Sequence, residues 1–194
     1  MKHRHLLAAG LFALAGFISA QAATITVLPD GGWNVFDVSD VGSSAGDLNW
    51  YDVNDGSALG FSFSIGDGQV GTLTVVDAVF SGDVFSVSAN GTLLGTTSAA
   101  VNSFPAGNNV GYDFDLALAD INYSRGIFKL GAGIYTVTGS LLSSALDELG
   151  APLNATAGGL KLEVSAVPEP STLAVVLAGL GLAGGYTRRR ARPV

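Results

Sequence analysis

The sequence predicts an all-β fold, a jelly-roll-like β-sandwich of about eight strands. Apolar and polar residues alternate with a period of two in several short segments, as they do in strands with one buried face. Glycine accounts for 27 of the 194 residues, a large share that is typical of a chain with many turns. Only 13% of the residues are charged and 48% are hydrophobic, which excludes a disordered polyelectrolyte.

The predicted strands follow one another between residues 23 and 166. Clean alternation occurs in four segments, Phe61–Ile65, Val84–Ala89, Ile134–Thr138 and Leu160–Val164. The segment Thr72–Phe80 is more continuously apolar, as expected for a strand that is buried on both faces. Ala23–Leu28 and Tyr112–Ala119 are two further candidate strands.

Turn residues separate these strands. Asn90-Gly91 predicts a two-residue hairpin, because both residues tolerate positive φ. The segment Leu141–Leu149 could form a short helix that ends before Gly150. With about 144 residues, the segment 23–166 can bury an adequate core without disulfide bonds.

The N-terminus, residues 1–22, has the three parts of a secretory signal peptide. Lys2 and Arg4 precede an uncharged run up to Ala20, and Ala20-Gln21-Ala22 forms a small-x-small cleavage site. We therefore expect a signal helix that passes through the secretion translocon and is removed by signal peptidase. The alternative is a retained membrane anchor, for which the apolar run is short.

The C-terminal residues 167–194 also have three parts. The first is the sequence Val167, Pro168, Glu169, Pro170, and the last is the cluster Arg188, Arg189, Arg190, Arg192. The uncharged stretch 171–187 between them would rise about 25 Å as a helix, enough for a single transmembrane helix in a thin bilayer. The arginines should stay in the cytoplasm, so the segment 23–166 would cross the inner membrane.

This three-part tail resembles the PEP-CTERM sorting signal of Gram-negative bacteria, with matches at Pro168-Glu169-Pro170, the apolar stretch Leu173–Gly185 and the terminal arginines. The resemblance implies that a membrane protease, exosortase, recognises the motif and removes the tail. It also implies a link to exopolysaccharide and biofilm, and a final location in the cell envelope, at the surface or in the extracellular matrix. A plain tail anchor is the alternative reading.

Composition excludes several classes of activity for the segment 23–166. The chain has no cysteine, and its two histidines, His3 and His5, lie in the predicted signal peptide. Ser–His–Asp and Cys–His catalysis and histidine-ligated metals are therefore excluded. The segment has 15 acidic residues against Arg125, Lys129 and Lys161, a net charge of −12. Such a surface repels nucleic acid and suits divalent cations or neutral glycans.

Three acidic residues are candidates for a cation site. On a strand, Asp113 and Asp115 would share one face about 7 Å apart, with Asp120 nearby. Such a pair could bind calcium or, in principle, hydrolyse a glycosidic bond. The alternative is a solvated strand face that discourages edge pairing.

Three aromatic residues are candidates for stacking on sugar rings, Trp33, Trp50 and Tyr51. Large aromatic residues of an all-β domain also commonly belong to the core. The leading hypothesis is an exported, non-enzymatic surface or matrix protein without a cofactor. The alternatives are a glycan- or calcium-binding module and a carboxylate-based hydrolase.

Overall fold

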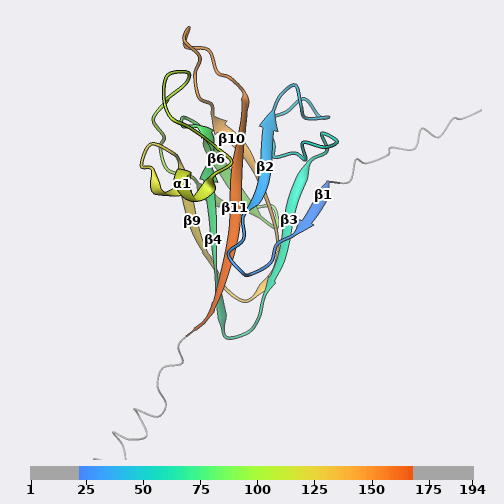
Figure 1. The fold of residues 1–194 in the computed structure, drawn as a ribbon. Helices are drawn as coiled ribbons and strands as arrows, with labels where there is room; N and C mark the ends of the chain where they lie inside the picture. The colour runs from blue at the N-terminus through green and yellow to red at the C-terminus, as the bar shows by residue number, and fades with distance from the viewer. Residues whose placement is uncertain (1–21, 168–194) are drawn as a thin grey trace, which may run out of the picture.

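Two β-sheets, packed face to face, are formed by residues 22–167, which are the residues that this computed structural model describes (Figure 1). The predicted signal peptide up to residue 21 and the tail from Pro168 onward, including the predicted transmembrane helix, lie outside these residues. Between residues 22 and 167, no helix is long and apolar enough to cross a membrane.

Sheet A has five strands and sheet B has four. In spatial order, sheet A contains β1 (Ala23–Thr26), β3 (Leu59–Ile65), β10 (Gly133–Ser143), β6 (Val84–Ala89) and β7 (Thr92–Thr96). Sheet B contains β2 (Asn34–Ser39), β11 (Ala155–Ala166), β4 (Gln69–Asp77) and β9 (Arg125–Leu130). A two-stranded ribbon of β5 (Val79–Phe80) and β8 (Asn109–Gly111) and the helix α1 (Phe114–Ala119) complete the structure.

The strand pairing is nested along the chain. β2 pairs with β11, β3 with β10, β4 with β9, and β6 with β7, and each of these pairs is antiparallel. This nesting is the strand order of a jelly roll, as the sequence predicted. β1 is an addition at the edge of sheet A, where it runs parallel to β3.

The main core lies between the two sheets and uses the alternation seen in the sequence. Phe61, Phe63 and Ile65 face inward from β3, and Phe85 and Val87 face inward from β6. Among the described residues, both sheets and the core lie within 23–166. We call this segment the β domain.

Strand β4 is buried on both faces, which explains its continuous apolar run. Leu73 and Val75 contribute to the core between the sheets, whereas Val76 belongs to a second cluster outside sheet B. In that second cluster, Phe114 and Ala117 of α1 pack over the sheet. The prediction of a strand buried on both sides is therefore confirmed.

Two predicted elements differ in the structure. The predicted strand Tyr112–Ala119 is wrong, because most of it forms α1, whose Phe114 and Ala117 are spaced to share one buried helix face. The sheet accepts this helix at Gly159, where a Cβ atom would lie 2.6 Å from the Phe114 ring. The predicted helix Leu141–Leu149 is also wrong, since β10 continues to Ser143.

The predicted hairpin at Asn90-Gly91 joins β6 to β7. Both residues have positive φ, 50° at Asn90 and 76° at Gly91, as a tight two-residue turn requires. The Asn90 side chain also receives a hydrogen bond from the N–H of Thr136, at 2.8 Å, and so attaches the turn to β10.

Candidate functional site

The outward surface of sheet A is lined by side-chain hydroxyl groups. In β3, β6 and β10, most of the residues between the core-facing positions are serine or threonine, and the exceptions are Gly60, Val84, Ile134 and Leu142. Together with outward residues of the two edge strands they form what we call the hydroxyl face: Thr24, Thr26, Ser62, Ser64, Ser86, Ser88, Thr96, Thr136, Thr138 and Ser140. Each of these residues is exposed or half-buried.

The strand register places these residues side by side in rows. Ser62 lies opposite Thr136 and Ser88 lies opposite Thr138, and Ser140 lies opposite Ser86. The hydroxyl oxygens of Ser86 and Ser140 are 2.7 Å apart and share a hydrogen bond. Since neighbouring strands are spaced by about 4.8 Å, each row presents hydroxyl groups at nearly regular intervals.

This face carries no formal charge. None of the five strands of sheet A contains aspartate, glutamate, lysine or arginine. The strands of sheet B, in contrast, contain six charged residues, Asp37, Asp77, Arg125, Lys129, Lys161 and Glu163. Hydrogen bonding by the hydroxyl face is therefore independent of pH between about 4 and 9, because hydroxyl groups do not titrate there.

Two hollows lie along the hydroxyl face. One has a volume of about 300 Å³ and is bordered by Ser86, Ser88, Thr138 and Ser140. Asn49 also borders it, from a segment that precedes β3 and pairs with β10 at Ser140. The other, of about 420 Å³, lies between β1 and β3 and is lined by residues including Thr26, Ser62, Ser64 and Ile134. The remaining lining of this second hollow is apolar, from Val27, Leu28, Pro29 and Phe63. The hollow at Ser140 has the more hydroxyl-rich lining, and because a hydroxyl group both donates and accepts hydrogen bonds, it suits uncharged polar ligands.

The hydroxyl face was not among the candidate sites predicted from the sequence. The alternation of Phe61–Ile65 and Val84–Ala89 was used only to assign strands. The available signal was the identity of the outward residues, because every polar position in these two segments is serine.

Trp50 and Tyr51 do not form a sugar-stacking platform, so this part of the prediction is wrong. Their exposed fractions are 1% and 8%. The Trp50 ring stacks on Phe36 at a centroid distance of 4.0 Å, inside the core. It occupies space that a side chain at residue 139 would need, since a Cβ atom on Gly139 would lie 2.4 Å from the indole.

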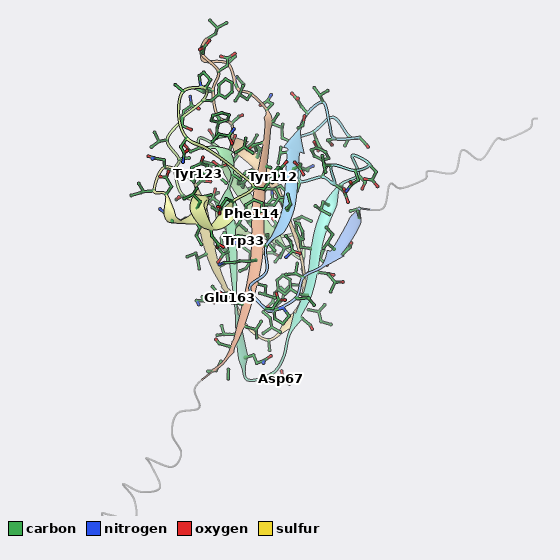
Figure 2. The ribbon with its side chains drawn as sticks, in the orientation of Figure 1. Trp33, Asp67, Tyr112, Phe114, Tyr123 and Glu163 are labelled. Carbon is green, nitrogen blue, oxygen red and sulfur yellow. The ribbon has the colours of Figure 1, made fainter. Side chains whose placement is uncertain are left out.

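Trp33 lies on the outside of sheet B, half-buried beside Phe114 (Figure 2). The Lys161 Nζ atom lies 4.6 Å from the centre of its ring, a cation–π contact. The indole Nε1 donates a hydrogen bond to Asp115 Oδ1 at 3.0 Å, and the same oxygen is 4.0 Å from Lys161 Nζ. The structure thus joins two predicted site residues, Trp33 and Asp115, in a contact that ties β2 and β11 to α1.

The three candidate cation ligands have separate local roles. Asp113 is the N-cap of α1, and its Oδ1 accepts a hydrogen bond from the Leu116 N–H at 3.0 Å. Asp120 accepts hydrogen bonds from the backbone and side chain of Asn122. The predicted shared strand face for Asp113 and Asp115 is wrong, because the chain is helical there. Within residues 22–167, no group of three or more acidic or histidine side chains is placed to hold a metal ion.

The β domain ends where the predicted sorting motif begins. The Val167 N–H donates a hydrogen bond to the Gly68 carbonyl oxygen, at 2.8 Å, in the turn between β3 and β4. The motif therefore starts directly at the end of β11, and a cut beyond Val167 would leave both sheets and the core intact.

Comparison with solved structures finds low similarity. The chain is 7% identical to the pre-peptidase C-terminal domain of a collagenase from Bacillus anthracis, covering 75% of this chain and 97% of that one, with a TM-score of 0.38. It is 10% identical to CorA, a surface-associated copper-binding protein of Methylomicrobium album BG8, covering 74% and 98% of the two chains, with a TM-score of 0.40. No curated protein matches the chain.

Comparison with protein families identifies the tail. Residues 166–191 match the PEP-CTERM protein-sorting motif, which confirms the resemblance based on Pro168-Glu169-Pro170 and the segments that follow. This motif is the recognition signal for exosortase and indicates export to the cell envelope or surface. The chain is thus a PEP-CTERM domain-containing protein, exported and sorted through its C-terminal residues.

Proposed function

We propose that the β domain is a non-enzymatic matrix module that binds neutral exopolysaccharide through the hydroxyl face. The observation that carries this proposal is an uncharged sheet surface on which rows of serine and threonine lie side by side, in a domain of net charge −12. A neutral polysaccharide presents many hydroxyl groups and no charge, and it matches this surface in both respects. An acidic polymer would be repelled by the domain as a whole.

The strength of such binding would come from repetition. One hydrogen bond between uncharged groups contributes only about 1 kcal/mol net in water. Rows of hydroxyl groups on β3, β10 and β6 would allow one extended chain to form many such bonds at once, and the hollow at Asn49 and Ser140 would hold a sugar ring. A long polymer with repeated sites would then be retained although each contact is weak.

The sorting signals explain how the domain reaches its ligand. The translocon would export the chain, and signal peptidase would cut after Ala22. The segment 171–187 would anchor the chain transiently, with Arg188–Arg190 and Arg192 in the cytoplasm. Exosortase would then act near Val167–Pro170 and release the β domain to the cell surface or matrix. The absence of histidine and cysteine from the sequence after His5 supports a role without catalysis.

Positive charge placed on the hydroxyl face should weaken polysaccharide binding. We expect the double variant Ser88→Lys/Thr138→Lys to lose at least tenfold in affinity for the host's neutral exopolysaccharide, because each ammonium group displaces hydroxyl contacts and must give up hydration. Affinity electrophoresis of the β domain in gels containing that polysaccharide measures the effect, with alginate as the anionic comparison polymer.

The matched control is Ser165→Lys, at an exposed position near the end of β11 in sheet B. For each protein, retardation is measured relative to its own mobility in a gel without polysaccharide, because the added lysines change the mobility by themselves. The retardation of the control should equal that of the wild type, and circular dichroism should show that all three proteins are folded. Unchanged retention of the double variant, or equal loss in the control, would contradict the proposal.

A further inference from the structure

A third hollow, chemically different from the two along the hydroxyl face, is lined by β5 and by loop residues. Its volume is about 290 Å³. Most of its lining is apolar. It comes from β5, from the loop before β8, from the segment between β10 and β11, and from the start of β11: Val79, Phe80, Phe104, Ala145, Leu153 and Ala155. Only Asp83 and Thr156 are polar. Phe80 and Phe104 meet edge to face, with ring centres 5.1 Å apart, and form one wall.

The polar end of this hollow is a buried carboxylate. Asp83 is 2% exposed, and its Oδ1 accepts a hydrogen bond from the Ala145 N–H at 2.8 Å. Asp77, which is fully buried, lies next to it and accepts a hydrogen bond from the Asp83 N–H at 3.2 Å. Burial raises the pKa of Asp83, and burial together with the Asp83 charge raises the pKa of Asp77 to about 9.

No basic side chain of the described residues neutralises this pair. The three basic residues between positions 22 and 167 all lie on β9 and β11, outside the lining of the hollow. The ion pair found within this range joins Lys161 to Asp115, on the outside of sheet B. A carboxyl group in such a place is costly to ionise without a cation beside it, and a positively charged ligand would lower that cost.

The backbone around the hollow is strained. Val79 has a φ of 62°, a left-handed conformation that is unusual for a β-branched residue. Its carbonyl oxygen accepts a hydrogen bond from the Tyr123 hydroxyl at 3.0 Å, which helps to hold this conformation. Gly82 has a φ of 145°, which glycine adopts without strain, and a Cβ atom there would lie 2.8 Å from the Ala145 Cβ, so no larger residue fits at this point. Strain of the kind seen at Val79 concentrates at binding sites.

We infer that this hollow binds a small apolar molecule carrying a primary ammonium group. The apolar body would lie against Phe80, Phe104 and Leu153, and the ammonium group would meet the carboxylate of Asp83. A cavity of about 150 Å³ holds benzene, so the larger volume here has room for an aromatic ring with a short amine chain. Apolar pockets with few, convergent polar groups are typical of small-molecule sites.

Three probes of similar shape and different charge test this inference. Binding of 2-phenylethylamine, 2-phenylethanol and phenylacetate to the β domain is measured by ¹H–¹⁵N NMR titration at pH 7. We expect the amine to bind at least tenfold more tightly than the alcohol, and the carboxylate to bind least. In Asp83→Asn, the affinity for the amine should fall to the affinity for the alcohol. In Asp67→Asn, which changes an exposed turn, the affinity for the amine should stay unchanged.

A second variant keeps the test decisive if Asp83→Asn does not fold. Ala155 is exposed and lines the hollow, so Ala155→Phe fills it from the outside. This variant should lose binding of both the amine and the alcohol. Equal affinities for amine and alcohol, absence of amine binding to the wild type, or full amine binding by Ala155→Phe would each overturn the inference. Failure of the β domain to bind exopolysaccharide would contradict the function proposed for the hydroxyl face and would leave the inference about this hollow unaffected.

Discussion

Asp77→Asn is expected to flatten the dependence of stability on pH. The carboxyl group of Asp77 is completely buried, next to that of Asp83, and its pKa is raised from 3.8 to about 9. In the unfolded chain the group ionises near pH 4, so above that pH the folded protein binds one more proton than the unfolded protein. The free energy of unfolding must then fall as pH rises from about 4 to about 9.

The size of the effect follows from the proton count. One proton corresponds to a slope of about 1.4 kcal/mol per pH unit, so Asp77 would lower stability on the order of 3–4 kcal/mol between pH 5 and pH 8. An asparagine cannot ionise, but its one amide oxygen replaces only one of the two carboxylate oxygens: the Ala78 N–H bonds to Oδ1, and the Gly82 and Asp83 N–H groups bond to Oδ2. The substitution therefore loses hydrogen bonds on one side at every pH, and this loss does not change the slope with pH. The free energy of unfolding of the variant should therefore fall less steeply with pH than that of the wild type, with a remaining slope of the same sign from Asp83, whose pKa burial also raises.

Urea unfolding of the β domain at pH 5, 6.5 and 8 measures this slope. Asp67→Asn, at an exposed turn between β3 and β4, controls for the removal of one negative charge. A slope in Asp77→Asn that equals that of the wild type would show that Asp77 is ionised in the folded state at neutral pH, which would contradict the raised pKa.

Trp50→Ala is expected to destabilise the fold by about 3–5 kcal/mol. The Trp50 side chain is 1% exposed, stacks on Phe36 at 4.0 Å and meets the Phe61 ring at 6.0 Å. Its removal leaves a cavity between the sheets that Gly139 cannot fill, because glycine has no side chain. A loss of this size is a large part of the stability of an ordinary domain.

Thermal and urea unfolding of the β domain measure this loss. Trp33→Ala is the matched control, because Trp33 is half-buried outside sheet B and should cost less than half as much. If Trp50→Ala kept nearly full stability and instead lost polysaccharide binding, Trp50 would be the stacking platform that the sequence suggested, and the core described above would be incorrect.

The sequence predicted the sheets better than it predicted the site. Alternation in Phe61–Ile65 identifies a strand and its two faces, because a period of two is a local property. Whether Trp50 is exposed depends on its pairing with Gly139, which is far away in the sequence. No local pattern contains that information, so the ring could be assigned to the core or to the surface with equal consistency.

The error at Asp113 and Asp115 has a similar origin. The apolar residues from Tyr112 to Leu118 fit a strand with period two, but Phe114 and Ala117 also fit one face of a helix. The helix forms because it packs over β4 and over Gly159, which lacks a side chain at that point. Asp113 then acts as an N-cap, a role that the sequence permits but does not require.

The sorting tail was predictable because its signal is linear. The order of Pro168-Glu169-Pro170, apolar residues and arginines can be seen in the sequence itself, and the family motif at residues 166–191 matches that order. The hydroxyl face, in contrast, gathers residues from strands far apart in sequence, such as Ser62, Ser88 and Thr138.

Intact-mass analysis of the protein recovered with the extracellular polysaccharide of its native host tests the central claim most directly. The account predicts a mass that lacks residues 1–22 and the segment after about Val167, found outside the cell and bound to the polysaccharide. A mass that retains the tail, found only in the membrane fraction, would contradict it.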